Sequence, residues 1–143
     1  MIVKQMNDKT FKKEYIAILT GNLNESSGTI DAPIARKAGS IMEREISENG
    51  ETAISHFELI KNYNNYCEVK YTLETGRTHQ LRVHSKYIGH TILGDTLYGE
   101  KSDLIDRQAL HAYKITFIHP ITKKTLTFES TLPDDMQNII KKP

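Results

Sequence analysis

ETGRTHQLRVHSKYIGHTILGDTLYG, residues 74–99, is the stretch of sequence that decides the fold, because the spacing of apolar residues changes there. Residues 67–73 before it alternate apolar and polar side chains, which is typical of a half-buried strand. Within the stretch, residues three and four apart share one helix face. They are Leu81, His84 and Ile88. Thr78 is placed to cap such a helix and Gly89 to end it, so the pattern predicts a helix over residues 78–88.

The same stretch concentrates positive charge. Between residues 75 and 94 there are three basic residues and no acidic one, whereas four glutamates gather in residues 43–51. Because the predicted helix begins where a strand ends, its first turn presents Arg77, Thr78 and Gln80 beside backbone N–H groups without helical partners. The sequence therefore predicts an anion site at this helix start, and a solvated acidic loop elsewhere.

The rest of the chain is predicted to form strands and short helices of a single domain, residues 1–143. The predicted strands are residues 13–20, 52–60, 67–73, 110–118 and 125–130. Turn residues at 62–65 join the second and third of these into a β-hairpin. Short helices are predicted over residues 2–9 and from Pro133 onward. The fold class is therefore α+β, with a mixed, mainly antiparallel sheet and a few helices.

The composition excludes several classes of protein. The chain has 143 residues, and 19 Lys and Arg against 18 Asp and Glu give a net charge of +1. A single cysteine, Cys67, excludes an intramolecular disulfide framework and a Cys-rich zinc site. No stretch approaches the roughly 18 apolar residues of a membrane span, so we expect a cytoplasmic protein with no membrane partner. Near-zero net charge alone argues against a nucleic-acid partner.

Common catalytic motifs do not match either. His79 and His84 are five residues apart, about 140° around a helix, so they do not converge on one metal ion. The His56-x-Glu58 pair lacks the P-C-x-x-C segment that a zinc deaminase requires. No G-x-S-x-G and no P-loop occurs. We expect no metal, no cofactor and no nucleotide-hydrolysis site.

Two segments resemble the long signature of the RluA-type RNA pseudouridine synthases: ETGRTHQLRVH at 74–84 and GHTILGDTLYG at 89–99. Three flanking pieces agree with that family, so that the resemblance covers essentially the whole chain. They are KEYIA at 13–17, GTIDAPI at 28–34 and RQALHA at 107–112.

The resemblance implies an isomerase that converts uridine to pseudouridine in structured RNA, rRNA or tRNA, without a cofactor. In the family, an aspartate of an H-R-L-D motif is the nucleophile, a tyrosine packs on the target base and a basic residue pairs with the aspartate. Tyr15 matches the tyrosine and Arg77 the basic residue. The resemblance places RNA contacts on the predicted helix start. These residues are Thr78, His79, Gln80, Arg82 and His84.

One departure from the family pattern is central. No H-R-L-D occurs in the 143 residues, and only fourteen residues precede Tyr15. The sequence therefore resembles the C-terminal part of a synthase catalytic domain that lacks the nucleophile and any S4-like domain. We expect it to be inactive alone. An alternative is a non-catalytic RNA-binding module or half of a split enzyme, and a third is a decayed remnant that forms a homodimer through an exposed sheet edge.

Structural roles remain open for most of these residues. Tyr15 on an apolar strand can be core packing, and Arg77 a solvated charge. Gln80 can cap a backbone group, Arg82 can face solvent and His84 can pack with the apolar stripe, which weighs equally with RNA contact. The same reasoning predicts a hydrogen-bonded structural role for His111, and turn N–H bonds to Asp95. If Arg77 has no carboxylate partner, a bound anion is expected beside it.

Overall fold

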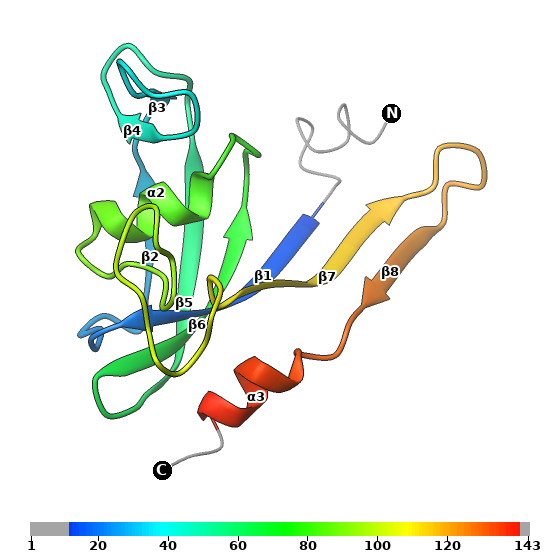
Figure 1. Cartoon of the computed structure of the whole chain (residues 1–143). Helices are drawn as coiled ribbons and strands as arrows, with labels where there is room; N and C mark the ends of the chain where they lie inside the picture. Colours follow the sequence, from blue (N-terminus) through cyan, green and yellow to red (C-terminus); the bar gives the residue numbers. More distant parts are fainter. Residues whose placement is uncertain (1–11, 141–143) are drawn as a thin grey trace.

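A computed structural model describes residues 12–140 of the chain (Figure 1). The predicted helix at residues 2–9 lies outside the described residues. The strands are β1 (Lys12–Thr20), β2 (Ser27–Asp31), β3 (Ile34–Arg36), β4 (Arg44–Ile46), β5 (Ile54–Asn62), β6 (Tyr66–Leu73), β7 (Leu110–Ile118) and β8 (Thr125–Glu129). The helices are α2 (Gln80–Tyr87) and α3 (Asp134–Ile140). All five predicted strands and both predicted helices within the described residues are present.

Six of the strands form one sheet in the order β2-β5-β6-β1-β7-β8, and β3 and β4 form a separate hairpin. Every neighbouring pair within residues 12–140 is antiparallel. This confirms the α+β class with a mainly antiparallel sheet. β2 and β8 are the edges of the sheet, so the predicted homodimer contact has an exposed edge available and stays a prediction.

The central strands carry the core. β6 is buried along most of its length and pairs with β5 as the predicted hairpin, while β1 contributes three consecutive residues that are fully buried. Those residues are Ala17, Ile18 and Leu19. β1 and β6 lie between other strands of the sheet, so both of their edges are paired, and β6 keeps the alternation of apolar and polar side chains that the sequence shows.

α2 lies over one face of the sheet. The hydroxyl groups of Tyr71 on β6 and Ser85 on α2 are 2.7 Å apart and buried. Because Tyr71 lies directly opposite Tyr15 of β1 in the sheet register, Tyr15 is on the same face as the helix. The first turn of α2 therefore lies on the face of the sheet that presents Tyr15.

The start of α2 differs from the prediction. Helical hydrogen bonding begins at Gln80, and His79 rather than Thr78 is the N-cap residue, in a left-handed conformation with φ 56°. No side chain caps the helix through a hydrogen bond. The end is as predicted, because Gly89 has a φ of 86°, which glycine adopts without steric cost.

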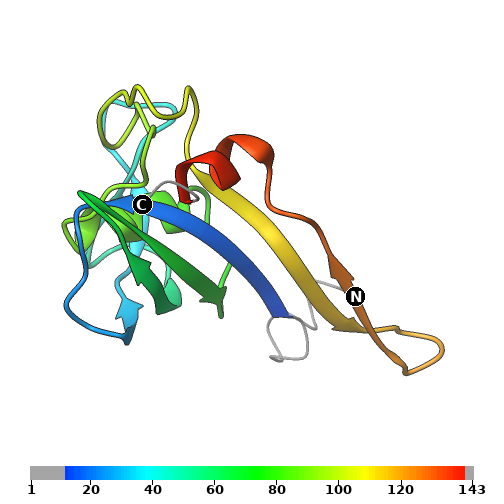
Figure 2. The ribbon, with the colours of Figure 1, turned by 90° about the horizontal axis from the view of Figure 1, so that it is seen from below.

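Two projections extend from this body. β7 and β8 form a long arm that curves away from α2, as Figures 1 and 2 show. Phe117 and Phe128 stack on this arm with ring centroids 5.9 Å apart. The β3–β4 hairpin projects at the opposite side of the molecule, above α2 in Figure 1. No helix in the described range is long and apolar enough to cross a membrane.

Candidate active site

An open pocket of about 360 Å³ brings together the two residues that the sequence singled out as catalytic, Tyr15 and Arg77. It lies between the start of β1, the start of α2 and the segment that leads into β7. The pocket is lined by Lys13, Tyr15, Leu73, Gly76, Arg77, His79, Gln80, Leu81, Arg82, Gln108 and Leu110. Its volume is within the range of small-ligand sites, about 300–1,000 Å³. Residues from sequence positions 13 to 110 therefore meet at one place.

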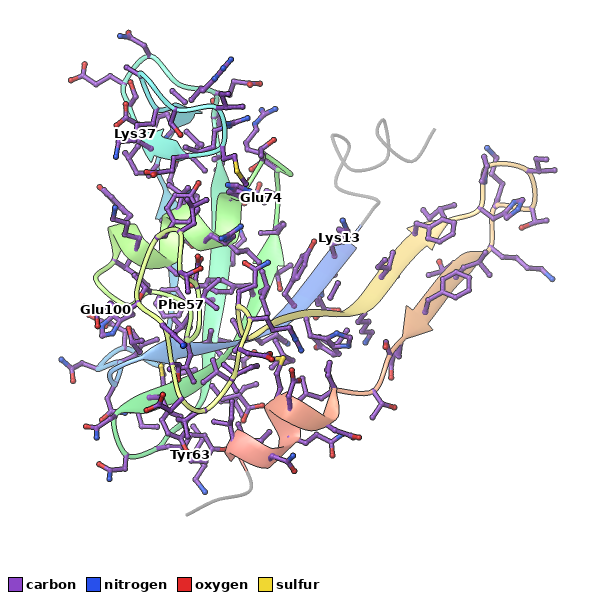
Figure 3. The ribbon with its side chains drawn as sticks, viewed as in Figure 1. Lys13, Lys37, Phe57, Tyr63, Glu74 and Glu100 are labelled. Carbon is purple, nitrogen blue, oxygen red and sulfur yellow. The ribbon has the colours of Figure 1, made fainter. Side chains whose placement is uncertain are left out.

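Tyr15 stands at an irregularity in the sheet. The register between β1 and β7 shifts between Glu14 and Tyr15, which marks a β-bulge or a related irregularity. Such features change the direction of a side chain and are common beside functional sites. The Nζ atom of Lys13 lies 5.8 Å from the centre of the Tyr15 ring, and Figure 3 shows Lys13 near the start of β1. Tyr15 is half-buried, so its ring combines support from the sheet with access to the pocket.

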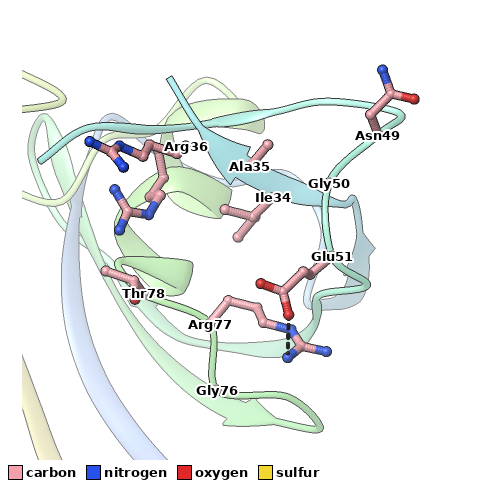
Figure 4. A pocket seen from close by; sticks show the side chains of 10 residues that line it. Ile34, Ala35, Arg36, Asn49, Gly50, Glu51, Gly76, Arg77 and Thr78 are labelled. Atoms are coloured by element: carbon pink, nitrogen blue, oxygen red, sulfur yellow. Dashed lines mark hydrogen bonds and ion pairs between the residues drawn. The ribbon is translucent and has the colours of Figure 1, made fainter. Parts of the chain in front are cut away.

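Arg77 has a carboxylate partner within the chain. Its Nη1 lies 3.1 Å from Oε2 of Glu51, and its Nε donates a 2.7 Å hydrogen bond to the carbonyl of Thr52 (Figure 4). Arg77 thus has a carboxylate partner, although not the aspartate of the family motif, and a bound anion is not needed to balance its charge. The acidic loop and the basic helix start, which are separate in the sequence, meet at this ion pair. Glu51 follows β4 and folds back onto the start of α2. Because Glu51 is 76% exposed, this ion pair is solvated and contributes at most about 1 kcal/mol.

Gln80 holds the start of α2 in place. Its Oε1 accepts hydrogen bonds from the Arg77 backbone N–H and from the Thr75 hydroxyl, while its Nε2 donates to the Ile54 carbonyl and the Ser55 hydroxyl. The side chain is buried, and its hydrogen-bonding groups are all used. These contacts favour the positioning role stated above as the structural alternative, and the predicted RNA contact of Gln80 stays a prediction.

His84 is also part of the interior. It is fully buried, and its Nε2 donates to the Ala32 carbonyl, so that its Nδ1 accepts from the Ser55 hydroxyl. Burial lowers the pKa of His84 below its ordinary value and keeps the ring neutral. His84 thus joins α2 to β5 and to the segment after β2, which favours the structural alternative; the predicted RNA contact stays a prediction.

Arg82 does not face solvent. Its Nε and Nη2 donate to the two carboxylate oxygens of Asp95 at 2.9 and 2.8 Å, and Asp95 is 1% exposed. Oδ1 of Asp95 also accepts the backbone N–H groups of Leu97 and Tyr98, which confirms its predicted role in the turn. Arg82 still lines the pocket, with its guanidinium 5.1 Å from the centre of the Tyr98 ring.

His79 and Thr78 remain accessible. Nδ1 of His79 is 2.8 Å from the Tyr98 hydroxyl, and burial, followed by the charges of Arg82 and Arg44, lowers the pKa of His79. His79 lines the Tyr15 pocket, and the exposed Thr78 lines a neighbouring pocket. Their predicted RNA contacts stay predictions.

Sequence reasoning missed Gln108 and Lys13 as pocket residues, although both lie in quoted motifs, RQALHA and KEYIA. Oε1 of Gln108 is buried and has no hydrogen-bond partner within the described chain. The same is true of Nε2 of His111, so this atom does not make the hydrogen bond predicted for that histidine within residues 12–140. Over the same residues no group of His, Cys, Asp and Glu is arranged to hold a metal ion.

Comparisons with known proteins identify relatives of this chain. The family model described as RNA pseudouridylate synthase matches residues 1–87, more than half of the chain. The uncharacterized RNA pseudouridine synthase YjbO of Bacillus subtilis is 45% identical over 130 residues, which cover 91% of this chain and 46% of that protein. Ribosomal large subunit pseudouridine synthase D of Vibrio parahaemolyticus is 36% identical over 149 aligned residues, covering 94% of this chain and 46% of that protein.

A solved structure shares the fold. Human RNA pseudouridylate synthase domain containing 1 aligns with a TM-score of 0.78 and 23% identity, over 98% of this chain and 68% of that one. The chain spans about half the length of the curated relatives it matches. The family match over residues 1–87, together with these relatives, shows that the chain belongs to the RluA-type RNA pseudouridine synthases.

Proposed function

We propose that this chain supplies the base-holding and carboxylate-orienting part of a site that isomerises uridine to pseudouridine in RNA. The observation that carries the proposal is the meeting of Tyr15 and Arg77 in one pocket, since these residues come from motifs 62 positions apart. An aromatic ring beside a guanidinium provides one group that stacks on a base and one that holds an anion.

Tyr15 supports the target base. Its ring is held by β1 between β6 and β7, and it faces the pocket at the irregularity after Glu14. A flipped uracil needs a flat apolar surface to replace the stacking that it loses in RNA. Stacking on an aromatic side chain contributes about 1–3 kcal/mol per base, so Tyr15 is suited to hold the uridine out of its helix.

Arg77 orients a carboxylate. Its guanidinium is positioned by the Thr52 carbonyl, and its backbone N–H by Gln80, so its direction is fixed before any ligand arrives. The ion pair with Glu51 is exposed and therefore weak, about 0–1 kcal/mol. A nucleophilic aspartate that is desolvated in the pocket can take the place of Glu51 at low cost. Pairing with Arg77 would keep that aspartate ionised.

The aspartate is not provided by an H-R-L-D motif in these 143 residues. We therefore infer that the chain by itself does not isomerise uridine. Turnover would require a second polypeptide or segment that carries the motif.

The test uses the 143-residue chain and an RNA stem–loop with either uridine or cytidine in the loop. We expect no pseudouridine by mass spectrometry of digested RNA, and tighter binding of the uridine loop. Tyr15→Ala should weaken binding of the uridine loop by about tenfold, the lower half of the stacking range. Tyr87→Ala is the matched control, because Tyr87 is 59% exposed and outside this pocket. Pseudouridine formation that Arg77→Ala abolishes would show that the inference of inactivity is wrong.

A second candidate is a non-catalytic RNA-binding module, which the lack of an H-R-L-D motif favours. This candidate predicts binding that does not distinguish uridine from cytidine and that Tyr15→Ala leaves unchanged. The same experiment therefore separates the two candidates.

A further inference from the structure

Within residues 12–140, three of the five arginines make ion pairs with carboxylates, and two do not. Arg77 pairs with Glu51, Arg82 with Asp95 and Arg107 with Asp135. Arg36 and Arg44, by contrast, have no carboxylate partner among residues 12–140. The chain thus carries two uncompensated guanidinium groups close to its candidate active site.

These two arginines lie directly opposite each other. Arg36 on β3 is the register partner of Arg44 on β4. Side chains at directly opposite positions of an antiparallel pair have Cβ atoms about 4.5–5.5 Å apart, and two like charges there destabilise the hairpin. A repulsive pair at the end of a three-residue strand is unfavourable unless an anion binds between the two groups.

Hydrogen bonds within the hairpin use only one of the three nitrogens of each guanidinium. Nε of Arg36 donates to the Ser40 carbonyl at 3.1 Å, and Nη1 of Arg44 lies 3.2 Å from the Met42 carbonyl, with longer contacts to its neighbours. These bonds close the loop between β3 and β4. They leave two nitrogens of each guanidinium without a partner within the described chain.

The hairpin is also held in position against the helix start. The backbone N–H of Arg44 donates to the Tyr98 hydroxyl at 2.9 Å, and that hydroxyl is 2.8 Å from Nδ1 of His79. Arg44 is therefore fixed relative to the first turn of α2 before any ligand binds. Such preorganisation reduces the entropy lost on binding.

Arg36 and Arg44 line a second open pocket, of about 490 Å³ (Figure 4), which adjoins the Tyr15 pocket. The two pockets share Gly76 and Arg77. Three arginines and one glutamate, Glu51, are the charged residues that line it, so the net charge of its lining is positive. Lys37, which follows β3 on the same hairpin (Figure 3), is not among the residues that line the pocket. Its Nζ pairs with Oε2 of Glu43 at 3.1 Å.

We propose that Arg36 and Arg44 clamp one backbone phosphate of the RNA, next to the nucleotide that enters the Tyr15 pocket. This inference rests on the proposed function, because the position of the phosphate follows from a uridine held by Tyr15. Two guanidinium groups facing one anion match the forked recognition of phosphate by arginine. Binding relieves the repulsion across the hairpin.

The experiment measures the affinity of the chain for the uridine stem–loop as a function of KCl concentration, by fluorescence anisotropy. Arg36→Gln with Arg44→Gln should weaken binding by about tenfold or more, and should lower the slope of log Kd against log[KCl] by about one. Lys123→Gln with Lys124→Gln is the matched control, since it removes two exposed charges at the tip of the β7–β8 arm. Arg36→Lys with Arg44→Lys keeps the charge and should retain most of the slope.

A second measurement guards against unfolding of the variant. Inorganic phosphate should raise the melting temperature of the wild-type chain and have no such effect on the Arg36→Gln, Arg44→Gln variant. The clamp would be overturned if the salt slope of the Arg36→Gln, Arg44→Gln variant equalled that of the Lys123→Gln, Lys124→Gln variant. If the arginine variant shows the lowered slope but the wild-type chain does not prefer the uridine loop over the cytidine loop, the clamp is supported and the proposed function is refuted. No RNA binding at about 100 μM protein, the weak end of non-specific affinities, refutes both.

Discussion

Replacing Arg82 by methionine should destabilise the chain far more than the same change at Arg107. Both arginines make a two-bond contact with an aspartate at 2.9 and 2.8 Å. They differ in burial: Asp95, the partner of Arg82, has a fully buried side chain, whereas the side chain of Asp135, the partner of Arg107, is 38% exposed. Methionine keeps the length and apolar character of the arginine stem, so the comparison isolates the charge contact.

The expected cost of Arg82→Met is about 3–5 kcal/mol, because it leaves a buried carboxylate with only two backbone N–H donors. Arg107→Met should cost about 0–1 kcal/mol, as for other exposed pairs. Burial alone would raise the pKa of Asp95, but hydrogen bonds from Arg82 and the Tyr98 backbone hold it below its ordinary value. The stability that this shift provides is present above the ordinary aspartate pKa of about 4 and is lost as the pH falls further.

The assay is urea denaturation followed by circular dichroism, at pH 7 and at about pH 3.5, below the ordinary aspartate pKa. At neutral pH the two variants should differ by at least about 2 kcal/mol in the free energy of unfolding. At the acidic pH the difference should shrink, because protonation of Asp95 in Arg82→Met removes the unpaired charge. Equal losses for both variants at pH 7 would refute the argument that burial decides the strength of the pair.

Two further predictions concern the scaffold around the pocket. Burial lowers the pKa of His84, so the wild-type chain should lose stability as the pH falls below about 6.5, the ordinary histidine value. In His84→Gln the melting temperature should depend less on pH in this range. An unchanged pH dependence would contradict this. Gly94→Ala should destabilise by about 2–4 kcal/mol in the same denaturation assay, since φ is 80° and a Cβ would lie 2.2 Å from the Arg107 carbonyl oxygen. Gly39→Ala, with φ 81° and no atom within 4 Å, should cost only about 1–2 kcal/mol, and equal costs would contradict the steric argument.

The elements of the sheet could be predicted because their signals are local. Alternation over residues 67–73 and the turn residues at 62–65 lie within one hairpin, so the sequence contains the whole pattern. β2 was not predicted, because its five residues, SGTID, contain a single apolar side chain. β3 and β4 were not predicted either, because three residues are too few to show a period of two. Their hairpin is stabilised instead by distant contacts, such as the backbone N–H of Arg44 with the Tyr98 hydroxyl.

The candidate site was predicted only in part. Motif resemblance identified Tyr15 and Arg77, and the structure places them in one pocket. The motif resemblance did not reveal that the side chains of Gln80 and His84 make internal hydrogen bonds, because their partner on β5, Ser55, lies 25 and 29 residues away in sequence. Spacing on a helix defines a face, whereas only the tertiary fold decides whether that face meets RNA or the sheet.

The net charge of +1 is a poor guide to anion binding, because it sums basic and acidic residues that lie in different places. The basic segment at the start of α2 looked like the place for an anion, yet its arginines are occupied by Glu51 and Asp95. The two arginines without a carboxylate partner in residues 12–140 belong to the β3–β4 hairpin, and one of them, Arg44, lies within the segment that the sequence marked as acidic. Where an anion could bind therefore depends on which cations lack a partner in the folded chain, and the net charge of the sequence does not contain that information.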